Sequence, residues 1–118
     1  MQDTDYIEGL LKFIQASPTP YHAVATMREM LDAEGFTQLR ESESWETTTP
    51  GRYYVTRNDS SLIAFSLTSD LADNGLRMVG AHTDSPCLKV KPNPEIVKTR
   101  YFQLGVEIYG GVLLNPWF

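Results

Sequence analysis

The run from residue 76 to residue 86 constrains the fold of this chain more than any other stretch. Residues 76–81 are mostly apolar and predict a short, largely buried strand, and the sequence His-Thr-Asp-Ser-Pro follows directly. In open α/β sheets, functional groups gather just beyond the carboxyl ends of the strands. We therefore expect an α/β fold in which His82 and Asp84 lie where a strand runs out into a loop.

The spacing of His82 and Asp84 suits a metal ligand and its supporting carboxylate. A neutral imidazole binds zinc through one ring nitrogen, while a carboxylate holds the other N–H and raises the basicity of the ligand. A catalytic zinc needs about three protein ligands. The nitrogen and sulfur donors of the chain are His22, His82 and Cys87, with no H-E-x-x-H or C-x-x-C motif. From spacing alone, a metal site and a purely structural pair both remain open.

Other residues that could carry chemistry are better explained by structure. His22 opens a predicted helix, where it would contact backbone groups or pack beside Tyr21. Cys87 is interpreted as a half-buried structural thiol, because a reactive cysteine needs a lowered pKa. Ser85 lacks a G-x-S-x-G elbow, and the glycines at 110–111 lack the G-x-G-x-x-G pattern of phosphate-binding loops.

Composition narrows the class of partner. Hydrophobic residues make up 42% of the chain and charged residues 21%, which is typical of a globular protein. The formal net charge of -5 disfavours nucleic acid, whose phosphates require a surplus of Lys and Arg. No apolar run is long enough for a membrane helix, and the acidic start is unlike a secretory peptide. We expect a cytoplasmic protein with neither nucleic-acid nor membrane partners.

The N-terminal third predicts two amphipathic helices. Apolar residues recur at helical spacing at Ile7, Leu10, Leu11 and Ile14. Prolines at 18 and 20 end that helix, and a second one opens near Pro20 or Tyr21. The apolar face of the second helix consists of Val24, Met27, Met30 and Leu31. Gly35 is placed to end it in a left-handed conformation.

The remainder predicts short strands. Strands are expected over residues 36–39, 52–57 and 62–67, the last two joined as a hairpin through the polar turn at 58–61. The polar stretch before the second strand reads as a loop anchored by one buried aromatic, Trp45.

Extended segments are expected further on, over residues 87–91 and 101–109, with a break at the Pro-Asn-Pro of residues 92–94. The chain then ends on two large aromatic residues, Trp117 and Phe118. Because termini are usually polar and exposed, we expect the chain to be an N-terminal fragment of a longer protein.

Three blocks of sequence resemble a known family. The sequence GAHTDSPCL at residues 80–88, continued by KVKP, resembles the signature of zinc metallopeptidases of the aspartyl aminopeptidase type. The blocks SPTPYH at residues 17–22 and QLGVEIYGG at residues 103–111 are similar to the same family. The resemblance spans essentially the whole chain.

This resemblance implies a function and a set of roles. The family implies a two-zinc exopeptidase, in which other divalent metals are also possible, that removes an N-terminal Asp or Glu from peptides. His82 would be the first metal ligand, and Asp84 the catalytic carboxylate that orients it. The remaining ligands and the general-base glutamate would lie outside this chain. We therefore expect the chain to be inactive by itself.

The resemblance also implies an architecture. Residues 1–92 would be the first part of the catalytic α/β domain of a zinc exopeptidase, with two helices followed by a mixed sheet. Residues 93–118 would begin an inserted β-rich dimerisation domain, and the family assembles into homo-oligomers, commonly dodecamers.

Two alternative functions remain open. The chain could belong to a non-catalytic assembly or interaction module derived from such an enzyme. It could also belong to a hydrolase that uses His82 and Asp84 as an acid–base pair with one metal or none.

Overall fold

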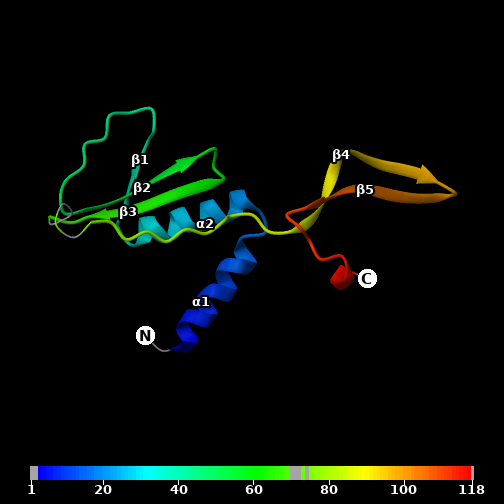
Figure 1. The fold of residues 1–118 in the computed structure, drawn as a ribbon, viewed down its shortest axis with the longest axis horizontal. Coiled ribbons are helices and arrows are strands. Elements are labelled where there is room, and N and C mark those ends of the chain that lie inside the picture. The colour runs from blue at the N-terminus through cyan, green and yellow to red at the C-terminus, as the bar shows by residue number, and fades with distance from the viewer. Residues whose placement is uncertain (1–2, 70–72, 74, 118) are drawn as a thin grey trace. The chain divides into compact units, whose positions relative to one another are not determined.

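The computed structural model describes residues 3–69, 73 and 75–117, and it divides into two compact units, residues 1–83 and 84–118. Within the described residues, the first unit contains helices α1 (Asp3–Ala16) and α2 (Pro20–Ala33), followed by a three-stranded sheet (Figure 1). The second unit contains a two-stranded hairpin and a short 3-10 helix, η1 (Asn115–Trp117). Two helices followed by a mixed sheet confirm the predicted α/β class.

Helix α2 begins and ends where the sequence indicated. At its start, the side chain of Thr19 accepts a hydrogen bond from the backbone N–H of His22 at 3.4 Å, and Pro20 occupies the first turn. At its end, Gly35 has a φ of 75° and donates its N–H to the carbonyl of Asp32 at 3.0 Å. The next N–H, of Phe36, reaches back to the carbonyl of Leu31 at 3.0 Å, which completes a Schellman motif.

The left-handed conformation of Gly35 leads to a testable difference between two glycines. In Gly35→Ala, the new Cβ would contact only Arg52 Nη2 at an ordinary 3.6 Å, so the cost is conformational and about 1–2 kcal/mol. In Gly9→Ala, inside α1, the new Cβ meets nothing within 4 Å, and we expect a gain of about 0.5–1 kcal/mol. Urea unfolding followed by circular dichroism measures both. Equal effects of the two substitutions would contradict this account.

The three-stranded sheet is mixed. Strand β1 (Thr37–Leu39) runs parallel to β2 (Gly51–Arg57), and β2 pairs antiparallel with β3 (Ser61–Leu67). The turn between β2 and β3 places Asn58 and Asp59 at φ values of 52° and 51°. Asn and Asp tolerate this left-handed region better than other side-chain-bearing residues, and it matches the twist of a hairpin. The predicted hairpin is confirmed.

The core of the first unit is small. Its buried hydrophobic residues are Ala23 and Val24 of α2 and Tyr53, Tyr54 and Val55 of β2. The Tyr54 side chain is 1% exposed, and its hydroxyl donates to Asp32 Oδ1 at 2.8 Å. The pKa of Tyr54 is raised above its usual value, mainly by burial and to a smaller extent by this bond to the Asp32 carboxylate. Tyr54 is thus buried in the central strand and joined to helix α2 by a hydrogen bond.

The prediction of a buried strand over residues 76–81 is wrong. These residues form no strand, and Leu76, Met78 and Val79 are at least 70% exposed. A strand forms only where a neighbouring chain segment satisfies its backbone N–H and C=O groups. No strand in the described part of the chain pairs with this segment. The apolar composition of residues 76–81 therefore led to a wrong prediction, because a buried strand also requires a second segment to pair with it.

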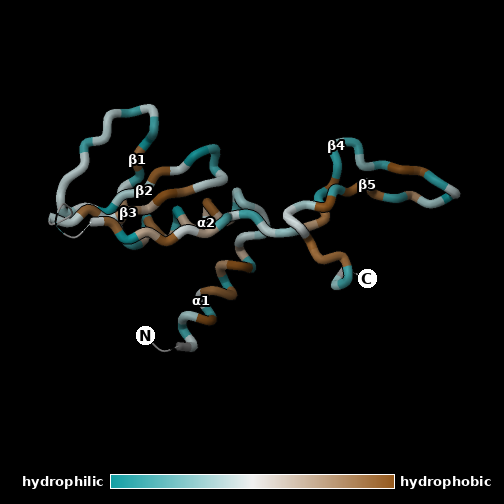
Figure 2. Tube along the Cα trace, in the orientation of Figure 1, coloured by the Kyte–Doolittle hydropathy of each residue, from teal (hydrophilic) through white to brown (hydrophobic). Residues whose placement is uncertain are grey.

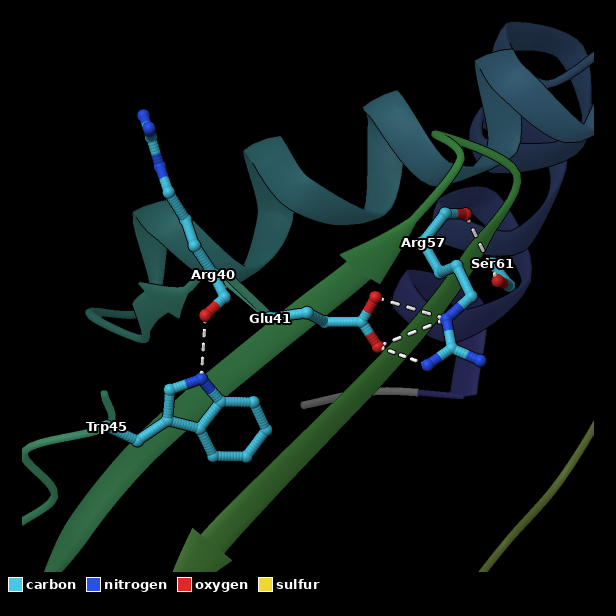
Figure 3. Close-up of polar contacts among 5 residues, drawn as sticks. All are labelled: Arg40, Glu41, Trp45, Arg57 and Ser61. Carbon is cyan, nitrogen blue, oxygen red and sulfur yellow. Dashed lines mark hydrogen bonds and ion pairs between the residues drawn. The ribbon is translucent and has the colours of Figure 1, made fainter. Parts of the chain in front are cut away.

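The polar loop between β1 and β2 is anchored, although not by a buried aromatic as predicted. Trp45 is 46% exposed, and its indole N–H donates to the carbonyl of Arg40 at 2.8 Å (Figure 3). Its ring stacks on Phe65 of β3 with centroids 6.3 Å apart. The Glu41 carboxylate accepts from Nε of Arg57 at 3.1 Å, and this bond lowers the pKa of Glu41. Hydrogen bonds, an ion pair and a ring stack hold the loop to the sheet.

The second unit is built on the hairpin of β4 (Cys87–Lys98) and β5 (Tyr101–Tyr109), which pair antiparallel. The predicted extended segments are confirmed. The break expected at the Pro-Asn-Pro sequence is instead a shift of register between Val90 and Glu95, inside one continuous strand. Strand β4 thus runs past residue 92, while the compact units divide at Thr83 and Asp84. The predicted boundary at residue 92, between the catalytic domain and the inserted dimerisation domain, stays a prediction.

The apolar stripe of α1 forms as predicted and is visible as recurring hydrophobic residues along that helix in Figure 2. Ile7, Leu10, Leu11 and Ile14 are each 58–60% exposed. Among the described residues, neither helix has the length and apolarity that crossing a membrane requires. Periodicity thus predicted which residues share a face, whereas the exposure of that face follows from packing.

Candidate functional site

The two predicted site residues fall on either side of the division between the units. His82 ends the first unit, in an extended segment, and its side chain is exposed. Asp84 begins the second unit and is half-buried. Both residues interact with neighbouring groups.

The segment that carries His82 is attached to the turn of the first hairpin. The hydroxyl of Thr83 donates to the backbone carbonyl of Ser60 at 2.8 Å. Ser60 is itself held in the turn, because its N–H donates to the carbonyl of Arg57 at 3.2 Å. This bond limits how far the backbone next to His82 can move from the sheet.

Asp84 is held by a residue that sequence reasoning did not single out. The hydroxyl of Tyr109, at the end of β5, donates to Asp84 Oδ2 at 2.6 Å. The pKa of Tyr109 is raised, mainly by this hydrogen bond and to a smaller extent by the negative charge of Asp84. The ammonium of Lys89 lies 5.5 Å from the centroid of the Tyr109 ring, within cation–π range. Tyr109 lies opposite Cys87 in the hairpin. Had the two predicted extended segments been paired with each other at the sequence level, Tyr109 would have been placed near Asp84.

The other candidates occupy structural positions. His22 lies in the first turn of α2, where its Nδ1 is 2.8 Å from the cap hydroxyl of Thr19. Cys87 is half-buried and unbonded to sulfur, as expected for a structural thiol. Ser85 is exposed, and Gly110 takes a φ of 69° at the end of β5. Nothing in these surroundings assigns a catalytic role to them.

The described residues do not by themselves fit a complete zinc site. No group of three or more His, Cys, Asp or Glu among them could hold a metal ion. A catalytic zinc needs about three protein ligands. The described residues therefore bring together no complete set of zinc ligands, and a ligand role for His82 stays a prediction.

Comparison with known proteins identifies the family. A family model described as "Aminopeptidase I zinc metalloprotease (M18)" matches residues 13–118, and the chain belongs to this family. A "Probable M18 family aminopeptidase 2" of Pseudomonas putida (strain KT2440) is 61% identical over 112 residues, which are 93% of this chain and 26% of the relative. The chain thus spans only about a quarter of the length of the curated relatives it matches.

Solved structures agree with the fold. The mApe1 of Chaetomium thermophilum superposes with a TM-score of 0.85 at 32% identity, over 97% of this chain and 26% of that one. The S. cerevisiae mApe1 dodecamer gives a TM-score of 0.82 at 32% identity, over 96% of this chain and 27% of that one. The resemblance found in the three sequence blocks is confirmed, and the fold matches part of a domain of these aminopeptidases.

Proposed function

We propose that this chain is the N-terminal part of a metalloaminopeptidase that releases N-terminal residues from peptides. The observation that carries the proposal is the family match over residues 13–118, which includes the His82–Asp84 segment and both flanking blocks of the resemblance, residues 17–22 and 103–111. The chain covers a minor share of each relative, so the activity is assigned to the longer protein.

Within this proposal, His82 is a zinc ligand and Asp84 is the carboxylate that orients it. An imidazole that binds zinc needs its second ring N–H held, and a carboxylate two residues away is a suitable acceptor. The remaining ligands and the general base come from parts of the longer protein outside this chain. The lack of a three-donor group among the described residues is consistent with that division.

Finer features of the proposal come from the resemblance. We assign the complete enzyme two zinc ions per subunit, a preference for N-terminal Asp or Glu, and a place in the cytoplasm. Residues 1–92 belong to its catalytic domain, and residues 93–118 begin an inserted β-rich dimerisation domain. A homo-oligomer, with twelve subunits as the expected order, is supported by the solved dodecamer of the S. cerevisiae relative.

The chain alone is expected to be inactive. After dialysis it should retain less than one zinc ion per chain, because one histidine cannot supply the three ligands that a stable site needs. It should also fail to release Asp from a peptide that begins with Asp, whereas the complete protein should do so and lose the activity in EDTA. Elemental analysis and a free-amino-acid assay measure the two quantities.

The same assay separates the alternatives. EDTA-sensitive release of Asp by the 118-residue chain would show that our assignment of the missing ligands is wrong. A complete protein that binds no metal and cleaves no peptide would favour a non-catalytic assembly module. Activity that survives chelation but disappears in His82→Ala would favour an acid–base pair without metal.

A further inference from the structure

The segment that begins at Asp84 is attached to the far end of β5 in three separate ways. The hydroxyl of Tyr109 donates to Asp84 Oδ2 at 2.6 Å. Cys87 and Tyr109 are partners in the register of the hairpin. Gly110, at φ 69°, packs so closely that an added Cβ would lie 3.2 Å from Cα of Pro86. The position of the Asp84 side chain is therefore set by Tyr109, at the end of a strand, 25 residues further along the chain.

The Tyr109 bond is of the kind that fixes a carboxylate. An O–H donor to an ionised oxygen forms a short, charge-assisted hydrogen bond, and 2.6 Å lies in that range. An ionised carboxylate has about four acceptor positions, so accepting from Tyr109 leaves capacity for an imidazole N–H. A group that orients a metal ligand has to be locked by its own neighbours, since small displacements weaken the site.

The Tyr109 ring is itself held on the hairpin. The ammonium of Lys89 lies 5.5 Å from its centroid. Two residues along each strand from Lys89 and Tyr109, Lys91 Nζ and Glu107 Oε1 form an ion pair at 3.1 Å across the hairpin. Both lysines project from β4, so the hairpin supplies the framework that keeps the Tyr109 hydroxyl near Asp84.

We propose that Tyr109 is a positioning residue, whose hydroxyl holds the Asp84 carboxylate in the orientation that serves His82. The inference rests on the proposed function, because the role of Asp84 toward His82 is part of that function. The contact between Tyr109 and Asp84 is a property of the second unit and is testable separately from any activity.

The first experiment tests the contact in the 118-residue chain. Tyrosine is labelled with ¹³C at Cζ, and the phenol of Tyr109 is titrated by NMR in the wild-type chain and in Asp84→Asn. Because the bond to Asp84 and its negative charge raise the pKa of Tyr109, that pKa should fall in the variant. Tyr101, at the opposite end of β5, serves as the control and should titrate unchanged. An unchanged pKa of Tyr109 would overturn the proposal.

The second experiment tests positioning in the complete protein. Tyr109→Phe keeps the ring and removes only the donor, so kcat should fall about 10–100-fold, as for other groups that support metal ligands. KM and the thermal midpoint should stay unchanged, and 3-fluorotyrosine at position 109 should restore kcat by restoring the O–H. Tyr101→Phe is the matched control. Wild-type kcat in Tyr109→Phe would overturn the proposal.

The two experiments separate failure of the inference from failure of the proposed function. If the wild-type complete protein lacked aminopeptidase activity, the proposed function would be wrong, and with it the role of Asp84 toward His82. The NMR titration would then still report whether Tyr109 holds Asp84. If the protein is active and Tyr109→Phe is as active as wild type, only the positioning role is wrong.

Discussion

Replacing Tyr54 by alanine is expected to lower the free energy of unfolding of the first unit by about 3–5 kcal/mol, the range found for large buried aromatic side chains. Tyr54 is 1% exposed and is one of five buried hydrophobic residues in the described part of the chain. Its removal leaves a cavity between the central strand and helix α2 that so small a core has little means to fill. The total free energy of unfolding of a small domain is only about 5–15 kcal/mol, so the loss should be visible as partial unfolding at room temperature. Urea titration followed by circular dichroism and tyrosine fluorescence measures it.

Tyr54→Phe is the matched control for this prediction. It keeps the ring in place and removes only the hydroxyl that donates to Asp32 Oδ1 at 2.8 Å. The expected loss is about 0.5–1.5 kcal/mol, the usual net value of one hydrogen bond. A Tyr54→Ala variant no less stable than Tyr54→Phe would show that apolar burial at this position contributes little.

Replacing His82 by alanine in the complete protein is expected to lower kcat/KM by more than about 100-fold, because loss of a group that merely supports a metal ligand already costs about 10–100-fold. Bound zinc per subunit should fall with it. His82 is exposed in this chain, so replacing it removes no packed side chain, and the thermal midpoint of the metal-free variant should stay near that of metal-free wild type. Peptide hydrolysis and elemental analysis on the same preparation measure both effects.

His22→Ala is the matched control, since it removes the other histidine of the chain. His22 lies at the start of α2 and contacts the cap residue Thr19, so its loss should affect helix stability and leave zinc content unchanged. Should His82→Ala retain both its metal and its activity, the assignment of His82 as a ligand would be wrong, and the pair with Asp84 would be structural.

The elements that the sequence predicted well depend on neighbours in the chain. The apolar spacing of α1, the prolines before α2 and the left-handed Gly35 all act within one or two helical turns. The turn residues Asn58 and Asp59 likewise determine the first hairpin locally. Sequence motifs also brought out His82 and Asp84 as the candidate site, because the resemblance rests on contiguous residues.

The tertiary structure alone decided what those residues contact. An apolar run such as residues 76–81 becomes a strand only if another segment pairs with it, and none of the described strands does. Trp45 is held by a backbone carbonyl and a neighbouring ring instead of being buried. Tyr109 reaches Asp84 only because β4 and β5 pair in one particular register. Local patterns determine secondary structure because their causes lie within a few residues, whereas burial and side-chain partners depend on segments far apart in the sequence.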